Sequence, residues 1–249
     1  MIFILTALLT LTSWAKFDLS LGLQGRTLPA LGAELYADSG YSFLMWGKKE
    51  NPKDVMYGLV RPSLGVSTSG VINSVKGEIE VFPISFLGIA AGRQIIHSNY
   101  DFPFFDCANI TCQGEFVRNY VEGKMVVGAQ GWIAMGSYRV DTLRGAKQSL
   151  EIADWRNVIT GEPGEDVQHE KKLIVGKMFS NKLVGILAEN VRFVGSGERK
   201  ESYAAVYQIR KNDVSYMVGS GIFRTSQEPM GLIFYFRIHY QPFPSLKLF

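Results

Sequence analysis

Residues 232–240 read LIFYFRIHY, and their side chains separate into two alternating rows. One row holds the apolar side chains Leu232, Phe234, Phe236, Ile238 and Tyr240. The other row holds Tyr235, Arg237 and His239. Successive side chains of a β-strand point to opposite faces of its sheet, so this run is predicted to be a strand with one apolar and one polar face.

The same two-residue alternation recurs in five further segments, which are 17–24, 71–81, 117–127, 132–141 and 203–210. Residues 84–97 and 171–194 show it less clearly, because apolar side chains stand on both faces there. Turn-forming residues separate the segments, among them Asp38-Ser39-Gly40, Arg144-Gly145 and Lys211-Asn212-Asp213. No internal stretch after residue 15 reaches 18 consecutive apolar residues, which argues against a helical membrane span. We therefore predict one all-β domain of antiparallel strands.

Composition excludes two broad classes of protein. The chain has 249 residues, of which 47% are hydrophobic and 20% are charged, and this hydrophobic content excludes a disordered chain. Its net charge of +3 is spread along the sequence. Nucleic-acid binding requires a concentrated basic face, so no nucleic-acid partner is expected.

The first residues have the pattern of an export signal. Residues 1–15 read MIFILTALLTLTSWA, with small residues at Ser13 and Ala15 where a signal peptidase would cleave. We predict a signal peptide over 1–15 and a single β-barrel domain over 16–249. Export would place Cys107 and Cys112 in an oxidising compartment, where we expect them to close a small disulfide loop.

Alternating strands also build soluble sandwiches, and a soluble exported β-sandwich that binds a ligand or partner stays an alternative. Segments of about 9–14 residues suit tilted membrane strands better than globular ones. Tyr and Trp near strand ends, such as Trp132 and Tyr203, fit the aromatic girdle of a membrane barrel. Small residues at polar-face positions, such as Gly22 and Gly219, fit a crowded lumen. Pro62 is a mild contrary sign, because proline removes a ladder hydrogen bond.

Taken together, the export signal, the alternating segments through 17–249 and the final Phe249 resemble a bacterial outer-membrane β-barrel protein. The resemblance implies a location in the bacterial outer membrane, contact with outer-membrane lipid, and recognition of the C-terminal strand by the barrel-assembly machinery. It is a likeness of pattern and carries no diagnostic motif.

Strand number follows from length. After the signal, 249 − 15 = 234 residues remain, and roughly 19 residues per strand and connection give an up-and-down barrel of about 12 strands, with a range of 10–14. Counting back from a periplasmic C-terminus puts 226–229 and 160–169 outside the cell. The same count puts the cysteine loop 98–113 at the periplasmic end, unless one strand too many or too few is counted near residue 128.

Polar-face side chains predict what the lumen contains. The expected lumen-lining residues are Asp18, Lys76, Glu78, Glu80, Arg118, Glu122, Lys124, Arg139, Asp141, Arg210, Arg237 and His239. Their charges nearly balance, which favours cross-strand ion pairs over a selectivity ring of one sign. We predict a narrow passive pore for small solutes or ions, or a structural or surface barrel with a charge-paired lumen.

No catalytic, metal or cofactor motif is found, and the chain is expected not to be an enzyme. The remaining alternative is a barrel-embedded hydrolase of lipid or lipid A built on His97 and Ser98. Adjacent strand residues point to opposite faces, so these two could share a site only in a loop. His169 falls in a charged segment that is expected to be a solvated loop.

Overall fold

The computed structural model describes residues 15–26, 32–47, 56–101, 106–145, 147, 149–154, 157, 159–226, 230–243 and 246. Most of the predicted signal segment and the terminal Phe249 therefore lie outside the described residues. In the described part of the chain, no helix is long and apolar enough to cross a membrane.

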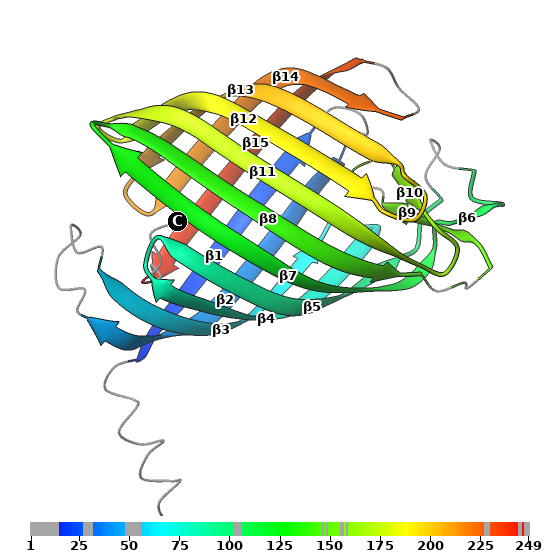
Figure 1. Ribbon diagram of the computed structural model, residues 1–249, viewed down its shortest axis with the longest axis horizontal. Helices are drawn as coiled ribbons and strands as arrows, with labels where there is room; N and C mark the ends of the chain where they lie inside the picture. The colour runs from blue at the N-terminus through cyan, green and yellow to red at the C-terminus, as the bar shows by residue number, and fades with distance from the viewer. Residues whose placement is uncertain are drawn as a thin grey trace, which may run out of the picture.

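Twelve antiparallel strands close into one barrel, as predicted (Figure 1). They are β1 (Ala15–Arg26), β2 (Gly32–Gly47), β3 (Tyr57–Thr68), β4 (Ile72–Ile84), β5 (Leu87–Ser98), β7 (Gly114–Ala129), β8 (Trp132–Arg144), β11 (Glu165–Phe179), β12 (Lys182–Phe193), β13 (Arg199–Lys211), β14 (Val214–Thr225) and β15 (Gly231–Phe243). Each strand pairs with its neighbour in the sequence, apart from the three short strands β6 (Ile110–Thr111), β9 (Glu151–Asp154) and β10 (Ile159–Gly161), which form a separate small sheet.

All six alternating segments of the sequence lie in barrel strands. The two blurred segments hold β5 and the hairpin of β11 and β12, joined by a tight turn at 180–181. Closure is made by β1 and β15, which pair from Leu19–Phe243 to Arg26–Tyr235. The barrel therefore has no free sheet edge between its first and last strands.

The apolar rows point outward. Leu64 on β3, Ile186 on β12 and Phe234 on β15 are 66%, 61% and 48% exposed. Polar side chains of the opposite rows are enclosed instead, with Arg61 and Glu80 only 2% and 0% exposed. A soluble sandwich would bury its apolar rows, so the sandwich alternative is wrong.

The two ends of the barrel differ in their connections (Figure 1). One end has two-residue turns at 130–131, 180–181 and 212–213, whose first residues Gln130, Ser180 and Asn212 have positive φ. This is a feature of tight hairpin turns whose twist matches the strands. The other end carries the long connections 99–113 and 145–164 with the small sheet. In outer-membrane barrels short turns face the periplasm and long loops face outward, so the small sheet lies at the extracellular end.

Four sequence interpretations of turns and loops need correction. Arg144-Gly145 and 160–169 are not two separate interruptions, because 145–164 is a single connection between β8 and β11 and residues 165–169 belong to β11. The cysteine loop therefore lies at the extracellular end beside that connection. Asp38-Ser39-Gly40 is the middle of β2 rather than a turn, and His169 lies on β11 rather than in a loop.

The outward orientation of Ile186 predicts a measurable cost for a charge at that position. Ile186→Arg should lower the free energy of unfolding by about 2–4 kcal/mol if the residue lies near the bilayer midplane, because a guanidinium then faces hydrocarbon. Urea titration of the protein refolded in phospholipid vesicles measures this. Ile186→Ala is the control and should cost much less, whereas equal costs would contradict the outward orientation.

Candidate functional site

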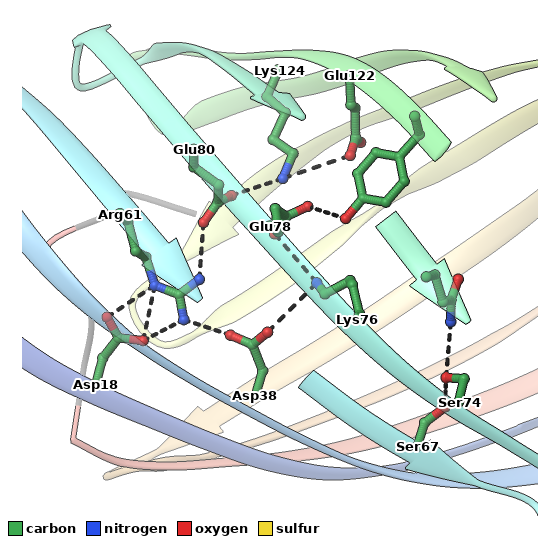
Figure 2. Close-up of polar contacts among 12 residues, drawn as sticks. Asp18, Asp38, Arg61, Ser67, Ser74, Lys76, Glu78, Glu80, Glu122 and Lys124 are labelled. Carbon is green, nitrogen blue, oxygen red and sulfur yellow. Dashed lines mark hydrogen bonds and ion pairs between the residues drawn. The ribbon is translucent and has the colours of Figure 1, made fainter. Parts of the chain in front are cut away.

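One arginine on the inner face of the barrel contacts carboxylates from three other strands (Figure 2). Arg61 on β3 donates to both carboxylate oxygens of Asp18 on β1, with Nε 3.0 Å from each. Its two terminal nitrogens reach Asp38 on β2 at 2.5 Å and Glu80 on β4 at 3.0 Å. The guanidinium thus ties together four consecutive strands from inside the barrel.

Further charges extend this cluster around the wall. Lys124 on β7 donates to Glu80 at 2.8 Å and stands 3.6 Å from Glu122. Lys76 lies 3.5 Å from Asp38 and 3.3 Å from Glu78, and Tyr120 donates to Glu78 at 2.7 Å. We call this set the Arg61 network; its members are Asp18, Asp38, Arg61, Lys76, Glu78, Glu80, Tyr120, Glu122 and Lys124.

The glycine at position 40 explains how the guanidinium fits. A Cβ built on Gly40 would stand 2.8 Å from Arg61 Cζ. Any larger side chain at this inward position would displace the guanidinium from Asp18 and Asp38. The sequence Asp38-Ser39-Gly40 resembles a turn but is part of the inner wall of the barrel. Asp38 provides a carboxylate for the network, and Gly40 leaves space for the Arg61 guanidinium.

A second group of charges lies on the neighbouring wall. Glu189 on β12 stands 3.0 Å from Lys200 on β13 and 3.4 Å from Lys172 on β11, and Lys172 also contacts Glu170. We call these four residues the Glu189 network. Arg139 on β8 lies against the Arg61 network, because its guanidinium is 3.8 Å from the Tyr120 ring centroid.

The hydroxyl group of Tyr36 on β2 makes contacts on the inner wall beside β1 and β15, the two strands that close the barrel. Arg237 on β15 donates from Nε to the Tyr36 hydroxyl at 2.9 Å, and the same hydroxyl lies 2.9 Å from Nδ1 of His239. Gly22 on β1 leaves room for the ring, since a Cβ there would meet Tyr36 at 2.2 Å.

Arg210 lies beside the turn at 212–213, where its Nε is 3.4 Å from the Asn212 carbonyl oxygen.

An inward-folded lid covers part of the extracellular mouth. We define the lid as β6, β9, β10 and the loop that the Cys107–Cys112 disulfide closes. Asp154 in the lid accepts a hydrogen bond from Gln168 at 2.6 Å and lies 3.6 Å from Arg118, both on barrel strands. Asn157 in the same connection accepts from Lys200 at 3.1 Å. The lid is therefore bonded directly to the charged lumen.

Apolar packing also holds the lid. Ile152, Ala153 and Ile159 of the lid pack with inward-facing side chains at the mouth. Those wall side chains are Ile96, Phe116, Leu143, Val191 and Phe193. A smaller apolar cluster lies apart from the lid. It consists of Tyr57 and Leu59 on β3, Phe82 on β4, and Leu246, whose carbonyl oxygen accepts a hydrogen bond from the Tyr57 hydroxyl at 2.5 Å.

The structure joins most of the predicted lumen residues into these contacts. Asp18, Lys76, Glu78, Glu80, Glu122 and Lys124 belong to the Arg61 network, and Arg139 contacts Asp141 at 2.5 Å. Sequence reasoning missed the inward residues Asp38, Arg61, Glu170, Lys172, Glu189 and Lys200. A sequence signal existed for Arg61, because Arg61, Ser63 and Gly65 alternate with Pro62, Leu64 and Val66 on β3.

The structure also separates the pair on which the hydrolase alternative depends. His97 is exposed on the outer wall, whereas Ser98 is 1% exposed on the inner face. Both lie on β5 rather than in a loop. The two side chains therefore do not form one site.

Asp101 lies near Cys107 and Cys112, but both sulfurs are in the disulfide and offer no thiolate to a metal.

Comparison with known proteins gives distant likenesses only. No family model and no curated protein matches the chain. Among solved structures, it is similar to the beta domain of the Bordetella autotransporter BrkA, with 10% identity, a TM-score of 0.46 and coverage of 91% of this chain and 99% of that one. It is also similar to an outer membrane channel from Pseudomonas putida F1, with 8% identity, a TM-score of 0.47 and coverage of 91% and 95%. At these values the likeness alone supports no inference about this chain.

The geometry itself places the chain in a class. A closed barrel with an even strand number, an apolar outer wall, mostly two-residue turns at one end and the longest connections at the other is the architecture of bacterial outer-membrane β-barrels. The chain is a β-barrel of the bacterial outer membrane.

Loss of the Arg61 guanidinium should destabilise the barrel. Arg61→Met leaves Asp18 enclosed without its cation, although Glu80 keeps its ion pair with Lys124, and should lower the free energy of unfolding by about 3–5 kcal/mol in urea titrations. The double variant Arg61→Met, Asp18→Asn should recover most of this loss, because the uncompensated charge is gone. Equal instability of the single and double variants would show that packing, rather than charge, dominates.

Proposed function

We propose that this protein is a non-enzymatic outer-membrane barrel that is closed at rest, with a charge-paired lumen and a lid over its extracellular mouth. The observation that carries the proposal is Asp154, which is 2% exposed and bonds the lid to Gln168 and Arg118 of the wall. An open pore would need a polar, solvated mouth at this place. Here apolar lid residues pack against Phe116, Leu143 and Phe193 of the wall instead.

The lumen supports the same proposal. Arg61 spans from β1 to β4, and Lys124 spans from β7 back to β4, so paired side chains occupy the inner face of this part of the wall. Charges that pair with one another attract a passing ion less than a ring of one sign does. Passage of small ions then requires the lid and some of these pairs to move, which makes the protein a structural or surface barrel with, at most, a gated narrow pore.

Deletion of β9 and β10, the part of the lid that is bonded to the barrel wall, tests this proposal sharply. We call the resulting protein the lidless variant, although it keeps β6 and the disulfide loop. Arg144 and Glu165 are paired across β8 and β11, so residues 145–164 can be replaced by a two-residue Asn-Gly turn that closes the hairpin at that point. The full-length protein should show no steady current in planar bilayers. The lidless variant should show discrete steps of conductance, because the mouth is uncovered.

A matched control keeps the lid and alters only the rim. Arg144→Gln with Glu165→Gln removes an exposed ion pair that does not hold the lid, and it should stay silent. Steady conductance of the unsubstituted protein, equal to that of the lidless variant, would contradict a closed resting state.

A further inference from the structure

Basic side chains gather on the outer wall of the barrel at its extracellular end, on β11 to β14. We call this set the basic patch; its members are Lys171, Arg192, Arg199 and Arg224. All four side chains are exposed. They belong to the outward rows of their strands and are therefore separate from the lumen networks described above.

Strand register brings the four together. One outward row runs Lys171–Asn190–Glu201–Arg224 across four adjacent strands. The next row toward the loops runs His169–Arg192–Arg199. Directly opposed residues of antiparallel strands have Cβ atoms about 4.5–5.5 Å apart, so these side chains form one continuous surface.

The patch has more cations than its carboxylates neutralise. Arg192 stands directly opposite Arg199, an arrangement of like charges that destabilises a sheet when nothing lies between them. The Glu201 carboxylate forms an ion pair with Arg224 at 3.0 Å. Among the described residues, no ion pair joins a carboxylate to Lys171, Arg192 or Arg199, including Glu198 in the adjoining turn. Four cations against the single carboxylate of Glu201 leave a surplus of three positive charges.

An apolar row lies immediately below the patch, toward the middle of the membrane. Leu173, Ala188, Tyr203 and Ile222 form that row across the same four strands. Leu173, Tyr203 and Ile222 are 47%, 53% and 44% exposed. The surface thus presents cations above and hydrocarbon contacts below, which matches an amphiphile with an anionic headgroup.

The opposite wall differs at the same end. There the outward row runs Thr68–Asn73–His97–Glu115 across β3, β4, β5 and β7, and Thr68 already donates to Asn73 at 2.7 Å. That row holds no lysine or arginine. The cationic surface is therefore a local feature of β11 to β14 and not a general property of the rim.

We propose that the basic patch binds the phosphate groups of an outer-leaflet glycolipid, the phosphorylated lipid A portion of lipopolysaccharide, while the acyl chains lie on the apolar row below. Arginine forks suit phosphate oxygens, and an anion between Arg192 and Arg199 removes their mutual repulsion. The inference depends on the placement of the loops outside the cell. It does not depend on a closed lumen, so the conductance experiment and the binding experiment fail independently.

Binding of purified lipid A to the full-length protein tests this proposal. The barrel is refolded into phosphatidylcholine nanodiscs, and its affinity for diphosphoryl lipid A is measured by native mass spectrometry. Arg192→Gln with Arg199→Gln should weaken binding at least tenfold. Arg93→Gln is the matched control, because Arg93 is an outward arginine on β5 outside the patch, and it should leave the affinity unchanged.

Headgroup chemistry and stability give independent readouts. A dephosphorylated lipid A should bind at least tenfold more weakly than the diphosphoryl form. Without lipid A, the double variant should melt at a higher temperature than the unsubstituted protein, since the opposed charges are gone, and added lipid A should raise the melting temperature of the unsubstituted protein alone. If the double variant does not fold, Lys171→Gln with Arg224→Gln replaces it.

Three results would overturn the proposal. The first is equal affinity of the double variant and the unsubstituted protein for diphosphoryl lipid A. The second is equal affinity of the phosphorylated and dephosphorylated lipids. The third is complete displacement of lipid A by millimolar inorganic phosphate, which would make the patch a site for free anions instead of a lipid.

Discussion

Backbone amides inside a bilayer have no water to bond, and each unpaired group would cost several kcal/mol. The pairing of β1 with β15 meets this requirement, because it gives the first and last strands partners on both sides. Every other feature follows from closure. A closed sheet has an inside and an outside, so alternation along each strand becomes a division between a wall that faces hydrocarbon and a lumen that collects polar groups.

Collecting charges in a lumen creates its own constraint, since an enclosed charge is tolerated only with a partner. Arg61 illustrates the solution: one guanidinium contacts Asp18, Asp38 and Glu80 from three different strands. The pairs hold the wall together from inside the lumen. The lid adds Asp154 to this interior, so the barrel wall and the attachment of the lid depend on the same kind of interaction.

Sequence alternation predicted the closed barrel because lipid exposure forces a strict two-residue period on most strands. It failed where that period is interrupted. The alternation in 171–194 is blurred because the apolar side chains of Ile174 and Leu187 face inward. Apolar residues on the inner row make it impossible to tell the lumen face from the lipid face by hydrophobicity alone. Gly40 was misread because glycine marks turns far more often than it makes space for a guanidinium. The sequence pattern of a single strand cannot show which charges pair in the lumen or that Asp154 contacts the barrel wall. Both depend on contacts between residues that are far apart in the sequence.

The lumen, the lid and the basic patch all require that each row of side chains faces the way described, and spin labels along a single strand measure that orientation directly. Labels placed one at a time at 203, 205 and 207 on β13 should collide readily with oxygen dissolved in the lipid. Labels at 202, 204 and 206 should be shielded from it, because they point into the lumen. The native cysteines are joined in a disulfide and would not react. Equal oxygen accessibility at odd and even positions would contradict the orientation from which the lumen, the lid and the basic patch are all derived.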